Sequence, residues 1–180
     1  LYYPSIDDSV LGEQVLDNTV TLPRYTDGEG VQVIAVSVAG RTGGARFYFT
    51  YTNSDGVSGR TSQIAYQNSA AALGTLQNSG ANANASAMPF VGLQAGDSGV
   101  RSIDSVFMLD ADVGLMTLIL VKPLGTSVIR EITAPVEKDY FMEAGVIPRI
   151  YDDAYLSFLC LPQGTLAATA LMGDIKTIFT

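Results

Sequence analysis

The sequence predicts an all-β protein, a β-sandwich or jelly roll of about eight strands, and three observations carry this prediction. Short segments rich in β-branched and aromatic residues recur along the chain, and several alternate apolar with polar side chains. Glycine, asparagine and proline separate these segments at the spacing typical of sandwich folds. A hydrophobic content of 47% in 180 residues provides a core that needs no disulfide or metal.

Three segments in the first third have strand character. Residues 31–39 are rich in valine and alternate in their second half, and residues 45–52 alternate aromatic with polar side chains. Asn53-Ser-Asp-Gly56 is a strong turn signal, after which residues 57–64 return as a more polar strand. We expect these segments to form a β-meander.

A second group of strands follows Pro89. Residues 99–107 alternate cleanly, whereas residues 115–121 are continuously apolar, as in a strand buried on both faces. Residues 110–114 connect them, which predicts a second hairpin. Beyond Pro123 the prolines indicate irregular connections, with two helical turns over 137–144 and a terminal hairpin formed by 155–161 and 166–179.

The predicted domain organisation is an extended N-terminal arm over residues 1–24 and one sandwich or jelly-roll domain over residues 25–180. A flexible loop at residues 67–87 interrupts this domain, because the tract consists mainly of Ala, Asn, Ser, Gly and Gln. A short helix around residues 70–76 is weakly indicated there, since Gly74 interrupts it.

Composition excludes several classes of function. The chain carries 10 basic against 18 acidic residues, a net charge of −8, and the basic residues do not cluster. Nucleic acid is therefore not an expected partner, because phosphate neutralisation needs a basic face. No segment approaches the ~20 apolar residues of a membrane helix, so no membrane partner is expected. The charged fraction of only 16% suggests that partner subunits cover much of the surface.

The residues offer little chemistry, and we predict no enzyme and no catalytic, cofactor-binding or metal-ligating residue. Histidine is absent, so Ser-His-Asp and Cys-His pairs cannot form. Ser98, in Gly96-Asp-Ser-Gly99, then has no base, and the motif is interpreted as a tight turn. Cys160 lies in an apolar run and is expected to be a small buried hydrophobe.

Acidic and aromatic clusters leave two alternatives open. Three pairs of aspartates, Asp7-Asp8, Asp110 with Asp112 and Asp152-Asp153, are interpreted as solvated turn carboxylates, with an inter-subunit calcium site as the alternative. Paired carboxylates also keep glycoside cleavage open, although tryptophan is absent. The tyrosines at 2–3, 48, 51, 151 and 155 are interpreted as core-edge and subunit contacts rather than a ligand cage.

Several stretches resemble virion structural proteins of tailed bacteriophages. They are Phe49-Thr-Tyr-Thr-Asn-Ser-Asp-Gly-Val-Ser-Gly-Arg-Thr-Ser62, Gly96-Asp-Ser-Gly-Val-Arg-Ser-Ile-Asp104, Leu118-Ile-Leu-Val-Lys-Pro-Leu124, Pro148-Arg-Ile-Tyr-Asp-Asp-Ala-Tyr-Leu156 and Leu159-Cys-Leu-Pro-Gln-Gly-Thr165. The resemblance spans residues 31–171 and rests on general pattern, without a catalytic signature.

This resemblance implies a capsid decoration or cement protein, often trimeric, on the outer surface of the phage head, with the major capsid protein as partner. The contact surfaces expected on that reading are the N-terminal arm, the 67–87 tract and the 110–114 loop. Two alternatives remain open. One is a tail, neck or receptor-binding module that recognises a host surface glycan, and the other is a small glycan-active enzyme with paired carboxylates such as Asp152 and Asp153.

Overall fold

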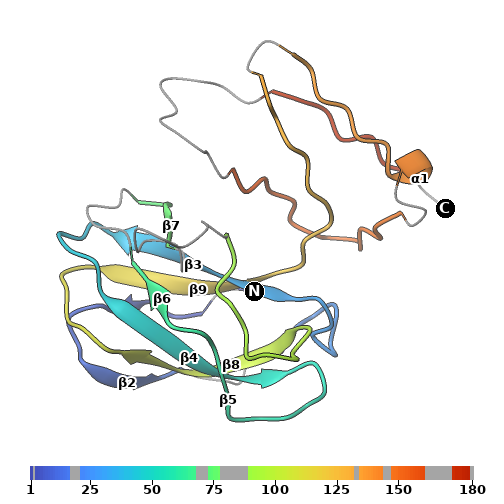
Figure 1. Ribbon diagram of the computed structural model, residues 1–180. Helices are drawn as coiled ribbons and strands as arrows, with labels where there is room; N and C mark the ends of the chain where they lie inside the picture. Colours follow the sequence, from blue (N-terminus) through green and yellow to red (C-terminus); the bar gives the residue numbers. More distant parts are fainter. Residues whose placement is uncertain are drawn as a thin grey trace.

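The protein is a β-sandwich followed by a long C-terminal segment whose described residues have almost no regular structure (Figure 1). The computed structural model describes residues 1, 3–16, 21–67, 73–77, 89–131, 134–143, 147–160 and 172–178. Within these residues the strands form two antiparallel sheets that pack face to face. The predicted all-β sandwich is confirmed.

The first sheet has four strands. Their order is β1 (Ile6–Asp7), β9 (Leu115–Val121), β3 (Gln32–Ala39) and β7 (Leu76–Gln77). β3 and β9 form its centre, with Ile34 opposite Ile119. The N-terminus continues the β1 edge, because Tyr3 N–H donates to the Leu118 carbonyl at 3.0 Å.

The second sheet has five strands. β2 (Gly12–Val15), β8 (Val100–Met108), β4 (Arg46–Asn53) and β5 (Arg60–Thr61) follow one another, and β6 (Ala65–Tyr66) also pairs with β4. β2 therefore forms one open edge of this sheet.

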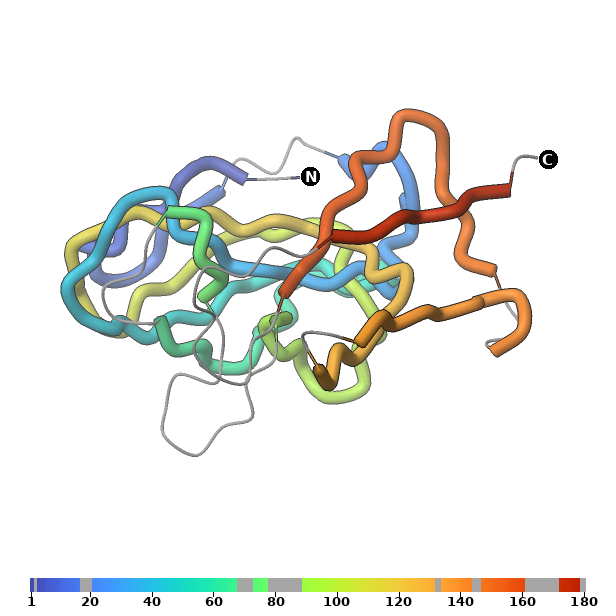
Figure 2. Tube along the Cα trace, turned by 90° about the horizontal axis from the view of Figure 1, so that it is seen from above, coloured from blue at the N-terminus to red at the C-terminus, as the bar shows by residue number. Residues whose placement is uncertain are grey.

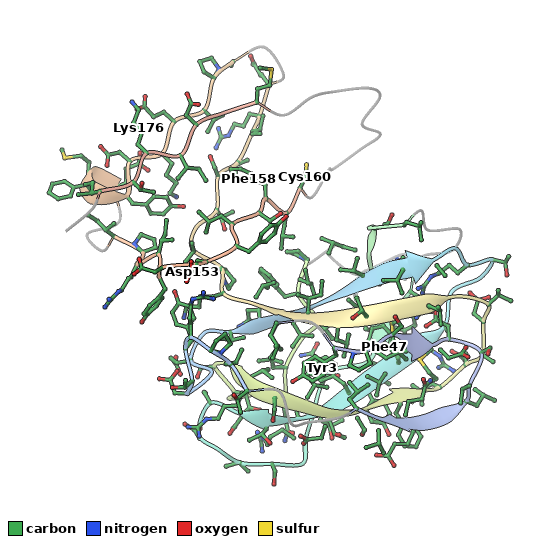
Figure 3. The ribbon with its side chains drawn as sticks, turned by 180° about the vertical axis from the view of Figure 1, so that it is seen from behind. Tyr3, Phe47, Asp153, Phe158, Cys160 and Lys176 are labelled. Atoms are coloured by element: carbon green, nitrogen blue, oxygen red, sulfur yellow. The ribbon has the colours of Figure 1, made fainter. Side chains whose placement is uncertain are left out.

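The core lies between the sheets, where Figure 3 shows Tyr3 and Phe47. Alternation in β4 points every second side chain inward, which buries Phe47, Phe49 and Tyr51 completely. The Tyr3 hydroxyl accepts a hydrogen bond from Ile103 N–H at 2.9 Å, so the buried phenol is satisfied. Every buried hydrophobic residue in the described chain precedes Lys122.

Two predicted strand pairings are wrong. The predicted meander would pair β3 with β4, and the predicted second hairpin would pair β8 with β9, but in each case the two strands lie in different sheets. Residues 40–45 and 109–114 cross from one sheet to the other at the same end of the sandwich (Figure 1). Each strand buries its apolar side chains against the opposite sheet, and periodicity does not encode that choice of partner.

Register shifts in the β4–β8 pairing alter the expected faces of β8. Strict alternation would place the Ile103 and Val106 side chains on opposite faces of the sheet, yet both are fully buried. The pairing shifts between Thr50 and Tyr51 and again between Thr52 and Asn53. A bulge of this kind adds one residue to one strand, so the side chains beyond it point to the other face of the sheet.

The N-terminal residues are extended, as expected, but their described part lies on the sandwich and does not project as an arm. β1 and β2 each extend one sheet, and Ile6, Asp8, Leu16 and Leu22 are buried. The apolar side chains of Ile6, Leu16 and Leu22 pack into the core, while the buried Asp8 carboxylate pairs with Arg41.

The described part of the 67–87 tract also joins the sandwich. Residues 73–74 form a turn and Leu76–Gln77 forms β7 against Ala35 and Val36, so the described end of the predicted 70–76 helix is not helical. The rest of that helix and residues 78–87 lie outside the described residues.

The C-terminal arm, which we define as the described residues after Lys122, departs most from prediction. Figures 1 and 2 show it above the four-stranded sheet and extending past one end of the sandwich. The predicted 137–144 helix shortens to α1 (Tyr140–Glu143), and residues 155–160 and 172–178 form no strand, so the terminal hairpin is wrong where it can be assessed. Cys160 is exposed and not buried, because its apolar run never reaches the core.

Candidate assembly site

The C-terminal arm carries most of the large hydrophobic side chains that are exposed among the described residues. None of its residues is buried, and it carries fourteen of the twenty-two large hydrophobic side chains that are exposed in the described chain. Met172 is 89% exposed, Met142 78% and Tyr155 93%. Isolated exposed hydrophobics are ordinary, but so many in one segment are unusual for a surface that faces only water.

One turn of the arm is fixed to the sandwich by a small aromatic and cationic cluster, which we call the latch. Tyr25 and Tyr151 pack edge to face with ring centroids 5.1 Å apart. Lys122 lies over the Tyr25 ring and Arg149 over the Tyr151 ring, at 5.1 and 4.7 Å from the centroids. Such cation–π contacts add about 0.5–1 kcal/mol each at exposed sites.

Hydrogen bonds complete the latch. The Tyr25 hydroxyl donates to the Arg149 carbonyl at 3.1 Å, and Arg24 Nε donates to the Asp152 carbonyl at 3.1 Å. Tyr25 has a φ of 53°, a left-handed conformation that costs energy in a non-glycine residue. The latch therefore holds residues 149–152 in place, while Phe158, Cys160 and Lys176 lie on parts of the arm away from the sandwich core (Figure 3).

The opposite end of the sandwich, which we call the loop end, consists of residues 8–11, 40–45 and 110–114. Its centre is an ion pair in which Arg41 Nη2 lies 3.0 Å from Asp8 Oδ2, with both side chains fully buried. Gln67 Nε2 donates to Asp8 Oδ1 at 3.0 Å. Burial raises the pKa of Asp8, against the opposing effects of Gln67 and Arg41, and it lowers the pKa of Arg41.

Close packing makes the loop end rigid. Asp8 N–H donates to the Gly114 carbonyl at 3.1 Å, and Asp112 N–H donates to the Asp8 carbonyl at 2.8 Å. Gly114 has a φ of 142°, and a Cβ there would lie 3.0 Å from Asp8 Oδ2. Around this rigid centre four aliphatic side chains are exposed, namely Val10, Leu11, Val113 and the nearby edge residue Val15.

The acidic pairs are largely used in local structure. Asp112 accepts hydrogen bonds from Gly43 N–H at 2.9 Å and from the Thr42 hydroxyl at 3.2 Å, while Asp110 binds Arg46 through two nitrogens. In the part of the chain that is described, no three acidic or cysteine side chains gather into a group able to hold a metal ion. The alternative of an inter-subunit calcium site, which would take ligands from two copies, stays a prediction.

A buried polar cluster around Asp97 escaped sequence reasoning. Asp97 accepts hydrogen bonds from the Tyr51 hydroxyl at 2.5 Å, Asn53 Nδ2 at 2.9 Å, and Arg60 Nε and Nη2 at 3.0 Å. Arg60 holds the pKa of Asp97 down to about 2, and burial together with Asp97 raises the pKa of Tyr51 to about 12.

The Asp97 cluster explains the Gly96-Asp-Ser-Gly99 motif. The turn lies at residues 95–96, one residue before the predicted Gly96–Gly99 turn begins, and it directs Asp97 against β4 and β5. Ser98 donates to Glu29 at 2.8 Å and also contacts the Ser54 hydroxyl. The cluster thus fixes a loop to the sheet, and alternation alone could not place Asp97 near Arg60.

Aromatic residues on the outer sheet face bear on the glycan alternative. Tyr48 and Phe107 stack on neighbouring strands with centroids 5.2 Å apart and an interplanar angle of 4°. One face of each ring is covered by the other ring, as in other cross-strand aromatic pairs.

The other residues considered for glycan binding or cleavage lie apart in the fold. Tyr51 is fully buried, whereas Tyr155 is exposed. Asp152 and Asp153 lie in an exposed turn of the arm. Glycan binding and carboxylate-pair catalysis stay predictions.

Comparison with known proteins identifies no relative. No family model, curated protein or solved structure matches the chain. Among the described residues, no helix has both the length and the apolarity needed to span a bilayer. The residues that sequence reasoning missed are the exposed hydrophobics of the C-terminal arm. A signal for them was present, since four prolines break this region into pieces while its apolar content stays high.

Proposed function

We propose that the protein is a virion structural protein, a decoration or cement protein that binds and stabilises the assembled head of a tailed bacteriophage. The observation that carries the proposal is the C-terminal arm, which exposes a long series of large hydrophobic side chains beside a sandwich whose core is complete without it. An arm of this kind gains stability only when another surface covers it. The phage setting comes from the sequence resemblance.

The proposed mechanism is thermodynamic. Each copy, on the outer surface of the capsid, would bury arm side chains across joints between major capsid protein subunits. A ligand that binds only the assembled state stabilises that state by mass action. Residues 128–142 are the part of the arm we assign to the capsid, with Val128, Phe141 and Met142 at 68%, 69% and 78% exposure.

Co-sedimentation with phage heads tests the proposal. The full chain should pellet with assembled heads that lack it, and should stay in solution with unassembled capsid subunits. The double substitution Phe141→Ser with Met142→Ser should weaken pelleting at least tenfold. Val57→Ser, at an exposed position of the sandwich, is the matched control and should bind normally. A wild-type chain that never pellets with heads would overturn the proposal.

A further inference from the structure

We propose that residues 155–160 of one copy add as a strand to the exposed edge of β2 in a second copy, so that copies of the chain associate head to tail. The proposal joins two features on opposite sides of the sandwich: a strand-like apolar segment of the arm that pairs with no described strand, and the open β2 edge of the five-stranded sheet.

The donor segment has the sequence of a strand but no strand partner. Residues 155–160 read Tyr-Leu-Ser-Phe-Leu-Cys, which is the composition of a buried strand. None of these residues pairs with a described strand, and Tyr155 and Phe158 are 93% and 67% exposed. A segment with the sequence of a strand but no sheet in its own chain to join can pair with the open edge of another sheet, which is β-strand addition.

The acceptor edge has free backbone groups. Leu16 N–H donates to the Asp104 carbonyl at 2.9 Å, so even-numbered residues of this strand bond to β8. Alternation then turns the N–H and C=O groups of Glu13 and Val15 outward. Within the described part of the chain these groups have no hydrogen-bond partner, and Val15 is 79% exposed. Open edges of this kind template pairing with another strand.

The geometry selects a second copy as the occupant. In Figure 1, β2 and the loop end lie at the left, with β2 in the lower, five-stranded sheet. The arm lies above the four-stranded sheet and toward its right end, in agreement with the view from above in Figure 2, so the arm and β2 are on opposite sides of the sandwich. The latch holds residues 149–152 at the arm's own end, immediately before the donor segment. A donor held there reaches the β2 edge of a neighbour, which is a heterologous contact.

Apolar complementarity favours the same pairing. The acceptor end offers Val10, Leu11, Val15 and Val113, all at least 45% exposed. Two large aromatic side chains bury about 150–250 Å² each, so Tyr155 and Phe158 with their neighbours supply a large share of the ~800 Å² that each partner of a standard interface buries. On a capsid, this pairing would link neighbouring copies, and only that role rests on the proposed function. The pairing itself does not depend on the proposed function.

The full chain tests the proposal without any capsid. Light scattering should give the wild type a mass at least twice that of the monomer. Val15→Pro removes the outward N–H that the added strand would bond to, so it should yield monomer. The variant should still fold, because an edge strand tolerates proline where the N–H faces solvent. Val15→Thr keeps that N–H and should remain oligomeric. A monomeric wild type, or a folded Val15→Pro variant that stays oligomeric, would overturn the proposal.

Cross-linking supplies a readout that does not depend on Val15→Pro folding. Cys160 is the single cysteine, so Val15→Cys should form disulfide-linked oligomers under mild oxidation. Adding Cys160→Ser should abolish them, and Val57→Cys, at 50% exposure, should form none beyond the wild type. Equal cross-linking by Val15→Cys and Val57→Cys would refute the pairing. Because no capsid is present, this failure is distinct from a failure to pellet with heads.

Discussion

Replacing Asp97 with asparagine should destabilise the sandwich far more than the same change at Asp110. Both aspartates form two-nitrogen contacts with an arginine, Asp97 with Arg60 and Asp110 with Arg46. Their surroundings differ, because the Asp97 side chain is 4% exposed and the Asp110 side chain 39%. The pair of variants therefore separates burial from ion pairing.

The expected loss follows from the partners of Asp97. Tyr51 is fully buried and donates its hydroxyl to the carboxylate, and a hydrogen bond to a charged group contributes about 1.5–3 kcal/mol. Arg60 is 26% exposed, so its pair adds no more than about 1 kcal/mol. We expect Asp97→Asn to cost about 2–3 kcal/mol and Asp110→Asn to cost far less, because the exposed Asp110–Arg46 pair is screened by water.

Urea unfolding followed by tyrosine fluorescence measures both losses. With a slope of about 1–3 kcal/mol/M, the midpoint of Asp97→Asn should fall by about 1 M or more, while that of Asp110→Asn should barely move. Equal midpoint shifts in the two variants would refute the reasoning, because burial would then not decide the contribution. A lower midpoint for Asp110→Asn than for Asp97→Asn would refute it more strongly.

The same carboxylate predicts how stability depends on pH. The folded pKa of Asp97 is about 2, below its usual value of 3.8. The stabilisation is therefore complete above pH ~4 and is lost as the pH falls through 2. The shift corresponds to about 2 kcal/mol at most, and solvent screening at Arg60 reduces it to about 1 kcal/mol. The stability difference between wild type and Asp97→Asn should shrink over this range, and a constant difference would contradict the assignment.

Three further predictions concern the loop end, the glycines and the arm. Asp8→Ala should cost about 3–5 kcal/mol in urea unfolding by leaving Arg41 charged and buried, and Asp8→Leu with Arg41→Met should recover most of it. Gly99→Ala should lower the thermal midpoint strongly, because its methyl group would clash with the backbone of Gly28 and Gly30 in the neighbouring loop, while Gly40→Ala, which meets nothing within 4 Å, should not. A fragment ending at Lys122 should keep the unfolding midpoint of the full chain, since every buried hydrophobic residue precedes it.

The central strands could be predicted from sequence because their signals are local. The expected segments 31–39, 45–52, 99–107 and 115–121 match β3, β4, β8 and β9 to within about one residue at each end. Which strands pair could not be predicted. Residues 40–45 and 109–114 have the polar, glycine-containing composition of hairpin loops, yet each connects two sheets, because pairing depends on contacts distant in sequence.

The candidate site was predicted in part. Residues 110–114 were expected as a contact surface, and the structure places Val113 there at 63% exposure beside Val10 and Leu11, although their role in contacts stays a prediction. The arm was missed because residues 155–161 fit a buried strand by every local rule. Local rules assume a partner sheet within the same chain. The same pattern in an unpaired segment indicates a partner elsewhere.

The separation of the core from the arm has an energetic consequence. The core residues make their contacts within the sandwich, so the free energy of folding is set there, whereas arm side chains make almost no apolar contacts that folding could gain from. Substitutions at distant sites without shared partners add independently. Changes at Phe141 or Phe158 should therefore alter assembly without altering stability, and changes at Asp97 should do the reverse. The latch is the one place where both effects meet, because Tyr25 belongs to the sandwich and Tyr151 to the arm.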